Sequence, residues 1–107
     1  MAETKRKMGK IGTKVLLDND RVRIWDFELP PGEDSPVHRH DLDYVLVQLA
    51  GDRIAVVPEP DSGGEYNEYM EADVSVGNSM YIKRGGIEVA RNVGSQTYRE
   101  ILIELKD

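Results

Sequence analysis

The sequence contains no cysteine. Disulfides, thiolate zinc sites and cysteine nucleophiles are therefore all excluded, and the chain needs no oxidising compartment. No apolar run approaches the roughly 20 residues of a membrane-spanning helix, and the basic start of the chain is not followed by the apolar core of a signal peptide. We therefore expect a cytoplasmic protein with no membrane partner. A chain of 107 residues is long enough for one domain with one core.

Positive charge is scarce outside the first 14 residues. The net charge is −6, although residues 1–14 carry five Lys or Arg and a single Glu, so the other 93 residues sum to −10. A body this acidic offers no basic face for phosphates, which argues against a nucleic-acid partner. We interpret residues 1–14 as a basic tail, flexible or exchanged as a strand with another copy, and residues 15–107 as the folded domain.

A helical period is also missing, because no stretch of ten or more residues repeats its apolar positions every 3.6 residues. Five prolines and ten glycines instead separate short segments rich in Val, Ile, Leu and Tyr. This pattern is typical of an all-β domain. The expected strands are residues 13–17, 22–29, 37–49, 53–58, 66–74, 79–83, 88–92 and 98–105. In strand 22–29, Trp25 and Phe27 share a face and are expected in the core. Strand 98–105 is apolar enough for burial on both faces or for an intersubunit contact.

The chain has only two histidines, His38 and His40, at the start of an expected strand. Alternate residues of a strand share a face, about 7 Å apart, so both imidazoles can reach one metal ion. Tyr44 and Gln48 have the same parity and are expected to face the same interior. Tyr44 could bind a metal as phenolate, donate a hydrogen bond to substrate or fill the barrel, and Gln48 needs a polar partner if buried.

Two spaced motifs now become visible, and both resemble those of the cupin superfamily. The first cupin motif, G-x5-H-x-H-x3,4-E-x6-G, is matched from Gly32 to Gly51 with every spacing intact and Tyr44 in the glutamate position. The second, G-x5-P-x-G-x2-H-x3-N, is matched from Gly77 to Asn92, with Lys in the proline position and Glu88 in the histidine position. An alternative register of the second motif places Val89 in the histidine position.

The resemblance covers residues 15–105 and implies an all-β fold, the double-stranded β-helix, a small jelly-roll-like barrel. It also implies a divalent ion (Fe, Mn, Ni or Zn) inside the barrel, held in this chain by His38, His40 and, if it turns inward, Glu88. The rival interpretations are satisfied barrel histidines and a surface carboxylate. The run H-x-H-x2-D-Y-V resembles a subgroup of small cupins labelled as β-alanine degradation proteins.

Three functions follow from this resemblance. The first is a metal-dependent enzyme, dioxygenase-like or a lyase or isomerase, acting on a small polar or carboxylated metabolite, with Tyr44 and Gln48 as candidate catalytic residues. The second is a metal-free cupin that binds or senses a small molecule, and the third is a filled, inactive barrel. Arg23 and Arg91 are candidate anchors for a carboxylate. A homodimer is expected, because a small barrel otherwise leaves strand edges open.

Overall fold

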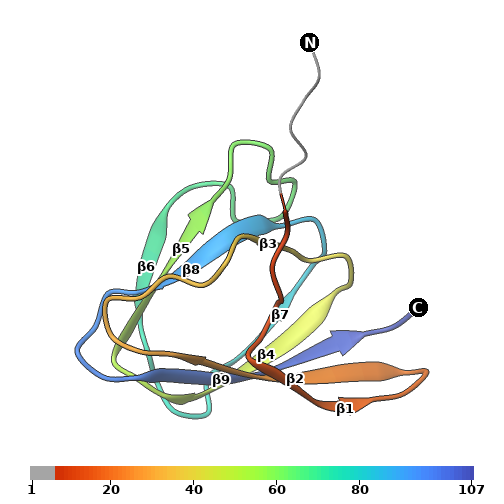
Figure 1. The fold of residues 1–107 in the computed structure, drawn as a ribbon, viewed down its shortest axis with the longest axis horizontal. Helices are drawn as coiled ribbons and strands as arrows, with labels where there is room; N and C mark the ends of the chain where they lie inside the picture. Colours follow the sequence, from red (N-terminus) through yellow and green to blue (C-terminus); the bar gives the residue numbers. More distant parts are fainter. Residues whose placement is uncertain (1–6) are drawn as a thin grey trace.

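The computed structural model describes residues 7–107, which form two antiparallel sheets that face each other (Figure 1). The strands of the first sheet lie in the order β1 (Lys14–Asp18), β2 (Val22–Leu29), β9 (Tyr98–Leu105), β4 (Tyr44–Ala50) and β7 (Ser79–Ile82). Those of the second lie in the order β3 (His38–Arg39), β8 (Ile87–Asn92), β5 (Arg53–Pro58) and β6 (Met70–Asp73). This is the all-β double-stranded architecture that the sequence predicts. Residues 7–107 include no helix long and apolar enough to cross a membrane.

The prediction of one continuous strand over residues 37–49 is wrong. β3 belongs to the second sheet and β4 to the first, and residues 40–43 carry the chain across. Asp43 fixes this corner, because its carboxylate accepts hydrogen bonds from the Arg84 backbone N–H at 2.9 Å and from the Tyr81 hydroxyl at 2.8 Å. The predicted strand 66–74 is likewise shorter and comprises only Met70–Asp73.

The core lies between the two sheets. It consists of the buried residues Phe27, Leu29, Tyr44, Leu46, Ala55, Ile82, Ile87, Tyr98 and Leu102. Phe27 is buried as predicted, whereas Trp25 is half-buried and donates its indole N–H to Glu104 Oε1 at 2.6 Å. β9 alternates buried and half-buried residues along its whole length, so it is not buried on both faces. Every second side chain of β9 is buried, and these buried side chains include two carboxylates, Glu100 and Glu104.

The segment that precedes β1 crosses the opening between the two sheets (Figure 1). Its backbone is attached at both sides of the opening, since Gly9 N–H donates to Val37 O at 2.6 Å and Thr13 N–H to Asp26 O at 2.7 Å. Between these bonds Ile11 reaches the cavity of the barrel. Gly12 allows the close approach, because a Cβ there would lie 2.7 Å from Trp25 Cβ. The first six residues of the predicted tail lie outside the described residues.

Candidate metal centre

The two histidines reach the interior from β3 and the residue after it. β3 pairs with β8, and hydrogen bonds from His40 N–H to Gly86 O and from Gly85 N–H to His40 O, both 2.8 Å, extend this pairing past Arg39. The extended backbone therefore points both imidazoles inward, as the alternation predicts. Their ring centroids lie 4.9 Å apart, and both side chains are buried.

Glu88 also turns inward, directly across the sheet from His38. The two residues are register partners in the β3–β8 pair. One ligand atom from each of His38, His40 and Glu88 lies within 4.8 Å of the others, and His40 Nε2 is 3.7 Å from Glu88 Oε2. Val89 pairs with Val57 and does not line the cavity, so the register of the second motif that places Glu88 in the histidine position describes the structure.

The protonation of His38 suits a metal ligand. Its Nδ1 lies 3.0 Å from the Pro36 carbonyl oxygen, which accepts only from an N–H, so the proton is on Nδ1 and the lone pair on Nε2. Burial, assisted by the neighbouring His40, lowers the pKa of His38 below its usual range. The ring is therefore neutral at neutral pH, with Nε2 free to bind an ion and its orientation fixed by the Pro36 carbonyl.

His40 lacks the polar partners that a buried imidazole normally has. Among the described residues, its Nδ1 is the one buried side-chain nitrogen or oxygen with no hydrogen-bond partner. Its Nε2 lies 3.7 Å from Glu88, beyond hydrogen-bond distance. A ring that is 2 % exposed and has an unpartnered Nδ1 is costly unless something binds it. Two imidazoles and a carboxylate are donors that Fe, Mn, Ni and Zn accept, so the residues fit such an ion.

Gly86 leaves room for the Glu88 carboxylate. A Cβ at Gly86 would lie 2.8 Å from Glu88 Oε1 and 3.8 Å from the His40 ring. Replacing Gly86 by alanine is therefore expected to push the flexible Glu88 side chain aside and weaken metal binding about 10- to 100-fold, the effect usual for outer-shell changes. The folded state should lose little stability, because a side-chain end moves cheaply. Calorimetric titration with Zn²⁺ and thermal unfolding check both halves of this prediction, and unchanged affinity would contradict it.

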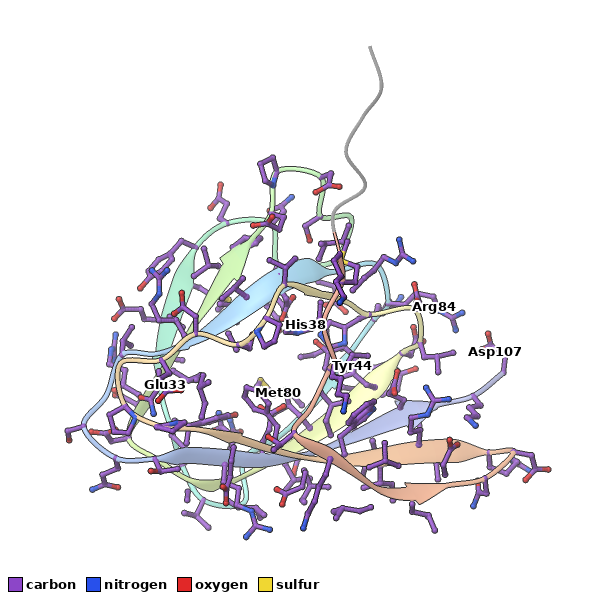
Figure 2. The ribbon with its side chains drawn as sticks, viewed as in Figure 1. Glu33, His38, Tyr44, Met80, Arg84 and Asp107 are labelled. Carbon is purple, nitrogen blue, oxygen red and sulfur yellow. The ribbon has the colours of Figure 1, made fainter. Side chains whose placement is uncertain are left out.

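Tyr44 lies against the cluster from the opposite sheet, as Figure 2 shows for Tyr44 and His38. Its ring stacks on His40, with centroids 4.1 Å apart and an interplanar angle of 19°. Burial, followed by the charge of Glu88, raises the pKa of Tyr44 far above its usual value. In the metal-free protein Tyr44 is therefore a neutral phenol at neutral pH, and its ring packs against His40.

Gln48 is buried but does not line the cavity. Its Nε2 donates to the Tyr98 hydroxyl at 3.3 Å, and Tyr98 in turn donates to Glu100 Oε1 at 2.5 Å. Sequence reasoning missed Tyr98 and Glu100, both of which line the cavity. A signal was present, because Glu100 has the same strand parity as the apolar residues Tyr98 and Leu102. Tyr66, another lining residue, comes from the loop before β6 and had no such signal.

The cluster occupies one wall of a cavity of about 110 Å³ between the sheets. Most of the cavity wall is apolar, and Met80 projects into it from the first sheet (Figure 2). Among the described residues that line it there is no Lys or Arg. The two arginines that the sequence offers for a carboxylate form ion pairs elsewhere, Arg91 with Asp34 at 2.8 Å and Arg23 with Asp18 at 3.2 Å.

Comparison with known proteins identifies the fold. No family model matches the chain, and no curated protein matches it. Among solved structures, it is similar to a cupin domain from Bordetella pertussis Tohama I, at 24 % identity and a TM-score of 0.75, over 97 % of this chain and 100 % of that one. The likeness shows the fold that the spaced motifs predict. It does not show the resemblance to β-alanine degradation proteins.

Two similar structures bear the names of enzymes. One is a polyketide cyclase from Streptomyces resistomycificus, 23 % identical, with a TM-score of 0.62 over 88 % of this chain and 63 % of that one. The other is a DMSP lyase from Ruegeria pomeroyi, 16 % identical, with a TM-score of 0.61 over 83 % of this chain and 40 % of that one. At these identities the likeness concerns the barrel alone.

Proposed function

We propose that this chain, a small protein with the cupin fold, is a cytoplasmic metal-dependent enzyme that acts on a small molecule inside the barrel. The observation that carries the proposal is the convergence of His38, His40 and Glu88 on one wall of the cavity, with ligand atoms within 4.8 Å of one another. Two imidazoles and one carboxylate leave positions of the ion open, as in non-haem Fe(II) oxygenases. A bound divalent ion would polarise a substrate as a Lewis acid or, as Fe(II), support oxygen chemistry.

The chain's own residues prepare this site. The Pro36 carbonyl sets the tautomer of His38, and the stacked Tyr44 ring holds His40 in place. The mostly apolar wall of the cavity strengthens polar interactions inside it. The reaction that we propose is an oxidation of the dioxygenase type, or a lyase or isomerase reaction. The names of the two enzymes with this fold support catalysis as a use of the barrel, without selecting among these reactions.

A metal-free binding or sensing protein is the second candidate. The observation in its favour is the apolar character of most of the cavity wall, which can hold a small molecule without an ion. In that case His38, His40 and Glu88 would hydrogen-bond the ligand. The presence of a cavity argues against the third possibility, a barrel filled by its own side chains.

Metal content separates the two candidates. Untagged protein incubated with Fe²⁺, Mn²⁺, Ni²⁺ or Zn²⁺ and then desalted is expected to retain close to one ion per chain, measured by plasma mass spectrometry. His38→Ala and His40→Ala should each remove nearly all of the metal, because two remaining donors hold an ion weakly. Glu33→Gln is the matched control, since Glu33 is exposed and lies away from His38 (Figure 2). Failure to retain any of the four ions would contradict the enzyme proposal and leave metal-free binding.

We also propose that the protein is a homodimer formed through β1. This edge strand exposes three successive apolar residues, Val15, Leu16 and Leu17, each at 45–49 %. If two copies pair antiparallel about Leu16, Lys14 of one lies opposite Asp18 of the other, so the strand is complementary to itself. Light scattering should therefore give twice the chain mass, and Leu16→Glu should give monomers. Val76→Glu, at a more exposed apolar residue, is the control, and a monomeric wild type would contradict the proposal.

A further inference from the structure

A second polar group faces the cavity from the sheet opposite the histidines. Glu100 lies on β9 between Phe27 of β2 and Gln48 of β4, its register partners. Its side chain is buried and lines the cavity, yet it is not one of the three residues whose ligand atoms converge. The metal centre described above therefore leaves a buried carboxyl without a role.

A directed chain of hydrogen bonds fixes the proton arrangement at Glu100. Gln48 Oε1 accepts from the Ser75 backbone N–H at 3.3 Å and from Asn78 Nδ2 at 3.2 Å, which places the Gln48 amide nitrogen toward Tyr98. Gln48 Nε2 donates to the Tyr98 oxygen, and the Tyr98 hydroxyl donates to Glu100 Oε1 at 2.5 Å. Because the Tyr98 oxygen already accepts from Gln48, its own proton points at Glu100.

It follows that a proton carried by Glu100 lies on Oε2, since Oε1 is the acceptor of the Tyr98 bond. Burial raises the pKa of Glu100 to about 7, with the Tyr98 bond opposing the rise and the Glu88 charge adding to it. The titratable groups that face the cavity with it are Tyr98 of its own strand, Tyr44 and Tyr66, and His38, His40 and Glu88 of the opposite wall.

We propose that Glu100 is the proton donor to the molecule that occupies the cavity, and that this molecule is a short carbonyl compound whose oxygen faces Glu100 Oε2. The proposal rests on the proposed function for the reaction that follows, but not for the binding itself. When the reaction moves the C=O bonding pair onto the carbonyl oxygen, the proton passes from Oε2 to that oxygen. The O–H bonding pair stays on Glu100 as a carboxylate, which the Tyr98 hydroxyl stabilises. A proton from solvent restores the acid.

The cavity sets the size and character of the ligand. Its volume of about 110 Å³ is smaller than that of the roughly 150 Å³ cavities that hold benzene, so the ligand has about five non-hydrogen atoms. Lining side chains such as Leu46, Ile54 and Leu102 suit a short alkyl body. Because the described residues that line the cavity include no Lys or Arg, no side chain there neutralises an anionic ligand, and a neutral ligand is favoured. A neutral acid therefore has a neutral oxygen as its natural partner.

Binding of 2-butanone, a five-atom ketone, to metal-free protein tests the proposal. Ligand-observed NMR in the presence of a chelator should show binding to the wild type at pH 6 that weakens about tenfold per pH unit above neutrality. Glu100→Gln keeps a neutral donor and should bind independently of pH, whereas Glu100→Met should bind weakly at every pH. Absence of binding to the wild type at pH 6, or the same pH dependence in Glu100→Gln, would overturn the proposal.

Tyr98 is a positioning residue in this scheme. Tyr98→Phe removes the donor that stabilises the Glu100 carboxylate, so the pH midpoint of 2-butanone binding should move upward. A merely structural role would lower the affinity without moving the midpoint, and that result would contradict the assigned direction of the hydrogen bonds. Both experiments use metal-free protein, so their outcome does not depend on whether His38, His40 and Glu88 bind an ion. Failure of this proposal is therefore distinguishable from failure of the proposed metal-dependent function.

Discussion

Replacing Glu100 by glutamine is expected to stabilise the metal-free protein by about 3 kcal/mol at pH 8 and by almost nothing at pH 4. Glutamine has nearly the shape of the neutral acid and still accepts the Tyr98 hydrogen bond through its carbonyl oxygen. Burial raises the pKa of Glu100 from 4.5 to about 7, and each pH unit between these values costs about 1.4 kcal/mol of folding free energy. The variant escapes this cost.

The sign follows from where the proton binds more tightly. The folded state holds the Glu100 proton more strongly than the unfolded chain does, so this carboxyl stabilises the fold fully below pH 4.5. That stability is lost as the pH rises through 7. The lowered pKa of His38 acts in the opposite direction, because the unfolded chain protonates that ring first as the pH falls below about 6.5. The difference between wild type and variant cancels His38 and isolates Glu100.

Urea unfolding between pH 4 and pH 8 measures this difference directly. The stability gain of Glu100→Gln should grow steadily over the range, and the melting temperature at pH 8 should rise on the order of 10 °C or more. The control is Glu28→Gln, the same substitution at a mostly exposed side chain. A constant difference across the pH range would show that Glu100 is not a buried neutral acid.

Replacing Asn92 by alanine is expected to destabilise the protein by about 4 kcal/mol. Asn92 is 1 % exposed and ties the end of β2 to the turn between β8 and β9. Its Nδ2 donates to Leu29 O and Gln96 O, both at 2.8 Å, and its Oδ1 accepts from Gly94 N–H at 2.9 Å. Each bond contributes about 1 kcal/mol, and the substitution also leaves the buried Leu29 carbonyl without this partner, at further cost.

Chemical denaturation of Asn92→Ala and Asn92→Asp checks this prediction. The aspartate keeps the acceptor for Gly94 but loses both donated bonds and brings a carboxylate against two carbonyls, so it should be at least as destabilising as alanine. Asn67→Ala, at an exposed position, is the control and should change stability by less than about 0.5 kcal/mol. A loss below 1 kcal/mol for both Asn92 variants would contradict the structural role assigned to this residue.

Much of the fold was predictable because strand periodicity is a local property. Alternation on one short segment indicated that His38 and His40 share a face, and the motif spacing placed Glu88 opposite them. The same parity put Tyr44 and Gln48 in the interior, where the structure has them. The crossing of the chain from β3 to β4 was not predictable, because it depends on contacts of Asp43 with Tyr81 and Arg84, which are far away in sequence.

Of the two carboxyl groups in the cavity, Glu88 was predictable from the sequence and Glu100 was much less so. The carboxylate that converges with the histidines was found because a motif spacing pointed to it. The signal of Glu100 was weaker, because it was only the parity of one residue beside the apolar run Ile101, Leu102 and Ile103. Only the alternate burial of β9 separates its inward residues from its outward ones. The chain of bonds from Gln48 through Tyr98 joins β4 to β9, so it emerges only from the register of the folded sheet.

The position of a bound ion is the most direct test of the account. A crystal structure of the protein soaked with Zn²⁺, with the ion located by its anomalous scattering, should show it inside the barrel about 2.0–2.2 Å from His38 Nε2, a His40 ring nitrogen and a Glu88 carboxylate oxygen. An ion bound only to surface carboxylates, or a barrel without an ion at saturating Zn²⁺, would contradict the assignment of His38, His40 and Glu88 as a metal centre.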